Sequence, residues 1–190
     1  VLNELDALAN IDFETRKEKT NLRQLTLVRI GTCGGLQKNT PIGTFIASKK
    51  SIGFDGLLNY YAKREELDIT FENEFNKQVN WNPQLGKIAQ DDMVRGITIS
   101  CGGFFGPQGR RLRIPLADPQ LNEKIVKFEY NGDRITNFEM ESSALAGLAQ
   151  HLGHKALTCC MVIANRRQKE ANSGYKNTID GLIKKVLERI

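Results

Sequence analysis

The stretch Asn137–Ser143, NFEMESS in one-letter code, runs from an apolar segment directly into a helical pattern. The residues before it predict a strand, and leucine and alanine at helical spacing predict a helix over 142–152. A carboxylate at such a junction is stabilised by the partly positive end of the helix and can accept hydrogen bonds. The two glutamates are therefore a candidate grip for sugar hydroxyls. In the alternative interpretation, Thr136 or Asn137 caps the helix and the glutamates only complement its dipole.

A second candidate site follows the predicted strand Leu25–Ile30, which ends in the glycine-rich segment Gly31–Gly35. Backbone amides in a glycine-rich loop can approach an anion closely, because glycine has no side chain. Arg29 adds a planar, permanent positive charge beside it. We therefore expect an anion-binding loop here. The alternative is that the glycines form a corner of the sheet and that Arg29 reaches into solvent.

A third predicted strand, Gly96–Ser100, also runs into glycines, in the segment GGFFGPQGR at 102–110. Two aromatic rings, an amide and a guanidinium within seven residues offer stacking faces, hydrogen-bond donors and an acceptor. Such a loop can recognise a planar heterocycle. A glycine-rich turn with Phe104 and Phe105 packed inward is the alternative.

The longest apolar run, Ala156–Ala164, predicts a fully buried strand that ends at Asn165, Arg166 and Arg167. Polar residues at the end of a buried strand often bind ligands in α/β proteins, although a solvated basic loop is the competing and commoner explanation. An amphipathic helix is predicted at 178–190, where the apolar residues form one stripe. Strands that alternate with helices indicate an α/β sandwich around a central sheet, and we expect the loops after the strands to converge on one cleft.

Length and composition fit one globular domain over residues 1–190, with 40% hydrophobic and 26% charged residues. The 27 basic and 22 acidic residues are scattered, which favours small anions over a nucleic-acid partner. The longest apolar run is too short for a membrane span, and we expect a cytoplasmic protein. Four cysteines without Cys-x-x-Cys spacing, and two histidines, predict reduced thiols and no metal site. Val1 lies inside a predicted helix over 1–9 with no capping residue before it, so we expect that an N-terminal portion is missing.

Four blocks of the sequence together resemble the nucleoside phosphorylases of the uridine phosphorylase type. They are VRIGTCGGLQ at 28–37, FFGPQGR at 104–110, NFEMESSA at 137–144 and VIANR at 162–166, in the family's order and spacing. The resemblance covers nearly the whole chain. It implies a three-layer α/β/α sandwich with a central mixed sheet. It also implies a pentosyltransferase of pyrimidine salvage that splits uridine or a similar nucleoside with inorganic phosphate, needs no other cofactor, and forms a homodimer or a higher homo-oligomer.

The resemblance also implies a role for each matching residue. Arg29 and Thr32 would bind phosphate, while Met140 and Glu141 would hold the ribose and Glu139 would support them. The base would be held by Gly34, Phe104, Gln108, Arg110, Ile163, Ala164 and Arg166. Arg29, Glu141 and Arg110 would carry the catalysis. Purine-cleaving relatives have an acidic residue near the last block, and the absence of one at 163–165 favours a pyrimidine.

Two alternative functions share this fold. A nucleosidase would use water instead of phosphate, but hydrolytic relatives generally lack the phosphate-binding arginine that Arg29 represents. A non-catalytic nucleoside-binding protein is the other alternative. It is suggested by the family's first phosphate-binding segment, which carries further arginines and would precede Val1.

Overall fold

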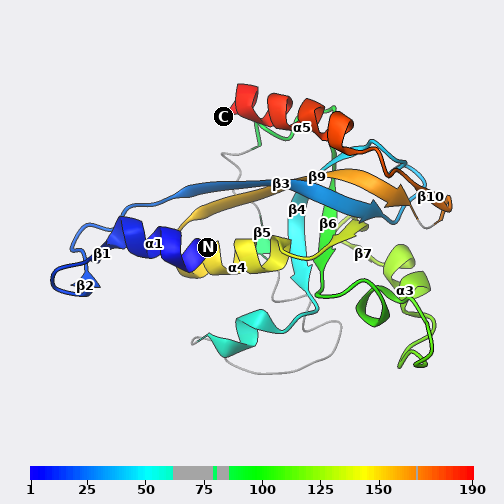
Figure 1. The fold of residues 1–190 in the computed structure, drawn as a ribbon, viewed down its shortest axis with the longest axis horizontal. Helices are drawn as coiled ribbons and strands as arrows, with labels where there is room; N and C mark the ends of the chain where they lie inside the picture. Colours follow the sequence, from blue (N-terminus) through cyan, green and yellow to red (C-terminus); the bar gives the residue numbers. More distant parts are fainter. Residues whose placement is uncertain (62–78, 81–85, 166) are drawn as a thin grey trace.

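The computed structural model describes residues 1–61, 79–80, 86–165 and 167–190, and its centre is one large sheet (Figure 1). The long strands are β3 (Thr26–Gly35), β4 (Phe45–Gly53), β6 (Val94–Ser100), β8 (Asp133–Glu139) and β9 (Lys155–Asn165). Two-residue strands extend it, namely β5 (Val79–Asn80), β7 (Glu129–Tyr130) and β10 (Glu170–Ala171). Branched apolar residues such as Ile97 and Ile99 are fully buried in β6, where they fit the pleated surface of a strand.

The strand order is β10-β9-β3-β8-β6-β4-β5, with β7 paired to β8. β3 runs parallel to β9, and β4, β6 and β8 run parallel to one another, but β3 and β8 are antiparallel. β4 also pairs with β9, from Phe45 opposite Met161 to Ala47 opposite Cys159. The sheet is therefore mixed, as predicted. It also closes on itself between β4 and β9, which makes its centre barrel-like.

The helices of the described residues are α1 (Leu2–Asn10), α3 (Leu121–Lys127), α4 (Ser142–His151) and α5 (Lys176–Arg189), with short 3-10 turns at η1 (Leu57–Tyr60) and η3 (Gly106–Gln108). The predicted helices near both ends of the chain and after the NFEMESS motif are confirmed. Within the described ranges, no helix combines the length and the apolar character that crossing a membrane requires.

Helices cover the sheet on two sides, so the three-layer prediction is confirmed (Figure 1). α5 buries Leu182 and Val186 in one cluster with Leu157 of β9. On the other side, Leu148 of α4 belongs to a cluster that Ala156 joins. Successive residues of a strand point to opposite faces, and this alternation lets β9 pack against both helices. Burying one such leucine stabilises the fold by about 2 kcal/mol.

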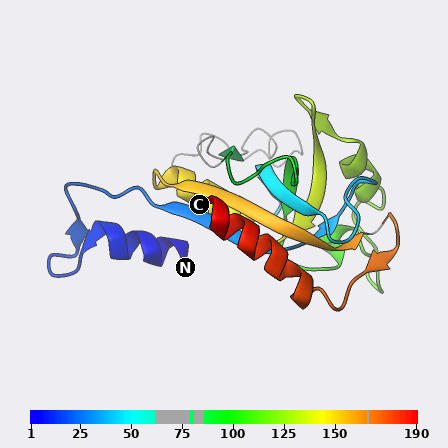
Figure 2. The same cartoon turned by 90° about the horizontal axis from the view of Figure 1, so that it is seen from above.

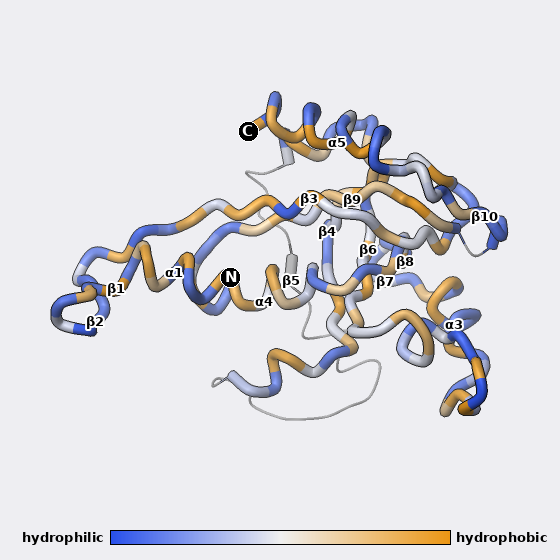
Figure 3. Tube along the Cα trace, in the orientation of Figure 1, coloured by the Kyte–Doolittle hydropathy of each residue, from blue (hydrophilic) through white to orange (hydrophobic). Residues whose placement is uncertain are grey.

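The N-terminal part extends from the body as an arm formed by α1 and the hairpin of β1 (Ile11–Asp12) and β2 (Lys17–Glu18), as Figure 2 shows. His154 ties the arm to the body, because its Nε2 lies 3.0 Å from Asp6 Oδ1 and its Nδ1 accepts a hydrogen bond from the Leu25 amide at 3.2 Å. In Figure 3, apolar segments run through β3 and β9 at the centre, whereas α1 and α5 alternate between apolar and polar residues, as amphipathic helices do.

The predicted loop at Gly31–Gly35 is wrong, since these residues continue β3. They pair with β9, and Gly34 and Gly35 also pair with Phe138 and Asn137 of β8. A Cβ atom on Gly35 would lie 2.5 Å from the Thr40 carbonyl oxygen, so the glycine allows two backbones to approach. β3 and β8 pair antiparallel at their C-terminal ends, so the segments that follow them leave in opposite directions. The loops therefore do not all leave one edge of the sheet, and the expectation that they converge on one cleft is wrong.

Candidate active site

Glu139 is the most buried acidic group of the NFEMESS motif, at the end of β8, and is only 4% exposed. Its carboxylate accepts hydrogen bonds from the amides of Glu141 (3.0 Å) and Ser142 (2.9 Å) and from the Ser142 hydroxyl (2.6 Å). The Ser100 hydroxyl at the end of β6 donates another. Glu139 thus satisfies the free amides at the start of α4, and the alternative cap by Thr136 or Asn137 is wrong, since both lie inside β8.

Arg29 connects the two glutamates. Its Nη1 lies 3.1 Å from Glu139 Oε2 and 3.3 Å from Cys160 Sγ, and its Nη2 pairs with Glu141. Burial lowers the pKa of Arg29, but the neighbouring Cys160, Glu139 and Glu141 raise it more, so the net pKa is above its ordinary value. Glu141 differs from Glu139 in that 57% of its side chain is exposed. The cluster therefore offers one fixed buried carboxylate, one accessible carboxylate and one permanent cation.

A glycine makes room for this cluster. Gly31 lies two residues after Arg29 on the same face of β3, and a Cβ atom there would lie 2.8 Å from Arg29 Nη1. The guanidinium thus folds back over its own strand, and any larger residue at 31 would displace it. Gly31 of this segment therefore creates space for the Arg29 side chain instead of exposing backbone amides in a loop.

The other predicted phosphate and ribose residues lie along the same elements. Thr32 is half-buried in β3, and Met140 is half-buried between the two glutamates of the motif. Gly34 pairs with both Ala164 and Phe138, so it lies where β9, β3 and β8 meet. Ile163 and Ala164 are half-buried at this junction, next to the end of β8.

The loop after β6 is held next to the cluster, because the Cys101 amide donates to the Glu139 carbonyl oxygen at 3.1 Å. Gln108 is 6% exposed, whereas Arg110 is exposed and donates its amide to the Phe105 carbonyl oxygen at 2.8 Å. Phe104 and Phe105 are 61% and 53% exposed. The alternative in which both rings pack inward is therefore wrong, and both remain available to a planar ligand.

The last predicted site residue, Arg166, lies outside the described residues. Its neighbour Asn165 is fully buried and donates Nδ2 to the carbonyl oxygens of Gln37 (3.0 Å) and Thr40 (2.7 Å). Asn165 also accepts a hydrogen bond from the Arg167 amide at 3.0 Å. This asparagine thus ties the end of β9 to the backbone of Gln37, Thr40 and Arg167.

Two residues of the cluster were missed from the sequence. Ser100 ends an apolar strand and has no motif around it, so only the meeting of β6 and β8 reveals its role. Cys160 lies inside an apolar run, and only its alternation relative to Leu157 and Cys159 could have placed it on the face of Arg29. The described cysteines are free thiols, and burial raises the pKa of Cys159 to about 12 and that of Cys33 well above its usual range. Within the described ranges, no group of three or more His, Cys, Asp or Glu side chains could hold a metal ion.

Comparison with known proteins identifies the family to which the chain belongs. The model of a family described as the phosphorylase superfamily matches residues 19–189. The chain is 31% identical over 159 residues to the uridine phosphorylase of Thermococcus kodakarensis, covering 76% of this chain and 50% of the relative. It is 26% identical over 179 residues to the uridine phosphorylase of Escherichia coli, covering 90% of this chain and 67% of the relative. The chain thus spans about half the length of the Thermococcus protein.

Solved structures share the fold. The crystal structure of a Trypanosoma brucei nucleoside phosphorylase, described as showing uridine phosphorylase activity, superposes with a TM-score of 0.78 at 22% identity. The match covers 98% of this chain and 72% of that one. An apo structure of isoform 2 of the Schistosoma mansoni uridine phosphorylase gives a TM-score of 0.61 at 20% identity, over 88% of this chain and 58% of that one.

Proposed function

The chain belongs to the phosphorylase superfamily, and on this basis we propose that it carries the active site of a uridine phosphorylase. The reaction is the phosphorolysis of a pyrimidine nucleoside, in which uridine and inorganic phosphate give uracil and ribose 1-phosphate. The observation that carries the proposal is the contact of Arg29 with both Glu139 and Glu141. It brings a cation for phosphate next to an accessible carboxylate for ribose. The two uridine phosphorylases compared above support a pyrimidine base.

In this proposal, Arg29 and Thr32 bind phosphate, and Glu141 accepts hydrogen bonds from the ribose hydroxyls beside Met140. A phosphate oxygen attacks the anomeric carbon as the bond from that carbon to the base nitrogen breaks. The bonding electron pair leaves with uracil, and the uracil anion then takes a proton from water. Holding phosphate below the anomeric carbon lowers the barrier by orientation. The ribose passes through an oxocarbenium-like state, whose positive charge the Glu141 carboxylate stabilises.

The base pocket consists of Gly34, Phe104, Gln108, Arg110, Ile163, Ala164 and Arg166. As the bond breaks, negative charge develops on the oxygens of the uracil ring. Gln108 and Arg110 are then better hydrogen-bond donors to the transition state than to the substrate, which is the condition for catalysis. The exposed ring of Phe104 supports a stacking role for this loop.

Glu139 acts as a positioning residue for Arg29. It is buried, and its contacts with backbone amides and hydroxyls leave it fixed. An arginine held by a fixed carboxylate presents its remaining N–H groups in a defined direction, which suits the bidentate recognition of phosphate. In the remaining part of the proposal, which the family resemblance supports, residues 1–190 form one domain of a cytoplasmic homo-oligomer in pyrimidine salvage that needs no cofactor besides phosphate.

The test is to incubate the purified protein with uridine and to follow uracil release by absorbance, with and without phosphate. We expect release only with phosphate, and ribose 1-phosphate as the second product. Release without phosphate, with free ribose as the product, would identify a nucleosidase. Binding of uridine in calorimetry without turnover would identify a nucleoside-binding protein.

A further inference from the structure

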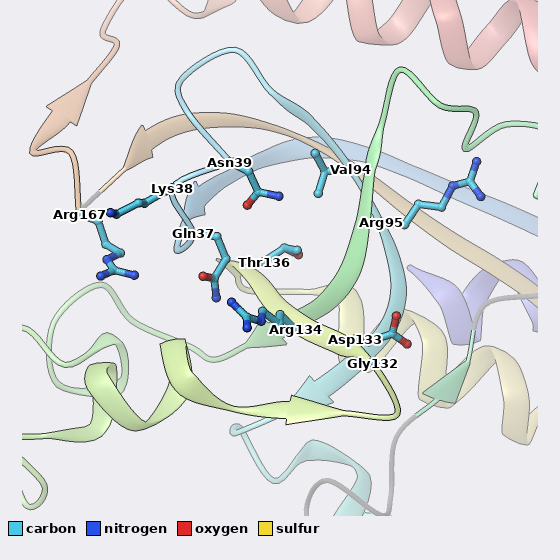
Figure 4. A pocket seen from close by; sticks show the side chains of 10 residues that line it. All are labelled: Gln37, Lys38, Asn39, Val94, Arg95, Gly132, Asp133, Arg134, Thr136 and Arg167. Carbon is cyan, nitrogen blue, oxygen red and sulfur yellow. The ribbon is translucent and has the colours of Figure 1, made fainter.

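A hollow of about 430 Å³ has a lining that includes none of Arg29, Glu139 and Glu141, and Figure 4 shows its side chains. Its walls come from the starts of β6 and β8 and from the segments that follow β3 and β9. The lining residues that bear on its chemistry are Gln37, Lys38, Arg95, Asp133, Arg134 and Arg167. A second hollow of about 580 Å³ shares Gln37, Arg134 and Arg167 and continues to Val126 and Lys127 of α3. The two hollows therefore meet at two arginines.

Positive charge dominates the first hollow, which is lined by Lys38, Arg134 and Arg167. Arg95 also lines it, but its guanidinium points away from the other lining side chains (Figure 4). Arg95 reaches Asp91 at 3.4 Å and Arg134 reaches Glu129 at 3.3 Å, both across exposed side chains where an ion pair is weak. Lys38 and Arg167 are exposed and form no ion pair with any other described residue. Figure 4 shows these two side chains at the same end of the hollow.

The acidic residue of the lining does not compensate this charge. Asp133 is occupied by two lysines outside the hollow, Lys49 at 2.9 Å and Lys50 at 3.1 Å. Burial raises the pKa of Asp133, but its hydrogen bonds to the lysines outweigh burial, and the net pKa is lowered. Because the single negative charge of Asp133 is paired with two lysines, it neutralises none of the cations of the hollow. The hollow therefore keeps an excess of positive charge.

The floor of the hollow is rigid. Gln37 is 7% exposed, and its Nε2 donates to the carbonyl oxygens of Ile135 (2.8 Å) and Val126 (3.2 Å). The backbone carbonyl oxygen of Gln37 accepts a hydrogen bond from Asn165 Nδ2. The cations are therefore arranged around a residue whose side chain is bonded to β8 and α3 and whose backbone is bonded to β9, which is the kind of support that a binding site requires.

The hollow is separate from the proposed active site. Asp133 begins β8 and Glu139 ends it. Arg134, the cation of the hollow on this strand, lies five residues before Glu139, and about 3.3 Å per residue separates their Cα atoms by about 16 Å. A phosphate bound to Arg29 therefore does not satisfy the cations at Arg134.

We propose that this hollow binds a small molecule that carries two or more phosphate charges, distinct from the phosphate consumed in the proposed reaction. Arginine guanidinium groups match phosphate oxygens in a planar, bidentate manner. Arg134 and Arg167 lie between both hollows, so phosphates bound there leave room for a nucleoside part over Val126. The inference does not depend on the proposed function, because it concerns residues that take no part in the reaction.

The test is calorimetric titration with inorganic pyrophosphate and with uridine diphosphate, in low salt, on three variants. Lys38→Ala/Arg167→Ala removes two exposed charges of the hollow, and Arg134→Ala removes a third. Lys17→Ala/Arg23→Ala is the matched control, because it removes two exposed charges from the N-terminal arm. We expect each hollow variant to bind pyrophosphate about tenfold more weakly or worse, since charge-assisted hydrogen bonds are lost, and the control to bind as the unaltered protein does.

An Arg29→Gln variant separates the two phosphate sites. We expect it to retain pyrophosphate binding, whatever its effect on uracil release. Tighter binding of uridine diphosphate than of pyrophosphate would show that the second hollow holds the nucleoside part, and equal binding would show that the phosphates suffice. The proposal is overturned if the unaltered protein does not bind pyrophosphate, if the hollow variants bind it normally, if the control loses as much affinity, or if Arg29→Gln abolishes the binding.

Discussion

At the scale of single residues, the two glutamates of the NFEMESS motif differ in environment more than their sequence suggests. Glu139 is buried, and its carboxylate contacts Ser100, Glu141, Ser142 and Arg29, whereas Glu141 is exposed and contacts Arg29. The sequence predicted correctly that the motif lies at a strand-to-helix junction. It could not reveal which carboxylate is buried, because this depends on Ser100 and Arg29, which come from two distant strands.

Glu141→Ala should reduce kcat/KM for uridine by about a hundredfold or more, because a transition-state hydrogen-bond acceptor is lost. The free energy of unfolding should change little, because the side chain is mostly exposed. Steady-state kinetics and urea unfolding on the same samples check both parts. A large loss of stability with normal kinetics would make Glu141 a structural residue.

Glu139→Ala should lower the free energy of unfolding by about 3 kcal/mol, since it leaves the buried side of Arg29 and the start of α4 without an acceptor. Glu139→Gln should retain part of this stability, because an amide oxygen can still accept hydrogen bonds. Urea unfolding of the three proteins measures the difference. Unchanged stability in Glu139→Ala would contradict the role assigned to this residue.

At the scale of elements, local patterns predicted β6, β8, β9, α4 and α5, because each carries its own apolar period. Local patterns failed where contacts between distant residues decide the structure. The last five residues of β3 include three glycines, and Arg29 and Thr40 occupy the space that side chains at Gly31 and Gly35 would need. The closure of the sheet between β4 and β9 and the helix α3 have no signal that we recognised in the sequence.

Gly31→Ala tests the strand interpretation of the glycine segment. A Cβ atom at 31 would lie 2.8 Å from Arg29 Nη1, so the guanidinium must move. We expect the KM for phosphate to rise while β3 remains paired, because alanine is compatible with an extended backbone. Phosphate titration gives the KM, and circular dichroism checks the fold. An unchanged KM would show that Arg29 does not bind phosphate in this position.

The ion pairs that attach α5 to Asp92 predict that the stability of the protein falls in acid. Asp92 contacts Arg189 at 2.8 Å and Lys185 at 2.7 Å, and hydrogen bonds to these residues lower the pKa of Asp92 well below the usual 3.8. A carboxyl group whose pKa is lower in the folded state stabilises the fold above its unfolded pKa. This contribution is lost as the pH falls below about 3.8 and through the folded pKa.

The comparison is between the unaltered protein and Asp92→Asn, with the urea midpoint measured from pH 5 to pH 2. The stability of the variant should fall less steeply over this range than that of the unaltered protein. Parallel curves would mean that the contacts of Asp92 with α5 do not contribute in solution.

At the scale of the whole molecule, a closed mixed sheet brings residues that are far apart in sequence to the two ends of β8. The C-terminal end of β8 brings Arg29, Glu139 and Glu141 together, and the N-terminal end of β8 contributes to the basic hollow around Arg134 and Arg167. The resemblance named Arg29, Glu139 and Glu141 of the first group, but not Ser100 and Cys160, which lie beside them. It gave no indication of the second, because the hollow arises from loops and strand starts that share no motif.

Phosphorolysis by this chain can be followed directly by 31P nuclear magnetic resonance of a mixture of protein, uridine and phosphate. We expect the inorganic phosphate signal to decline as a ribose 1-phosphate signal grows in equal amount, and Arg29→Gln and Glu141→Ala each to suppress this conversion. Uracil that accumulates while inorganic phosphate stays constant would contradict the proposed phosphorolysis, as would an Arg29→Gln variant that converts phosphate at the unaltered rate.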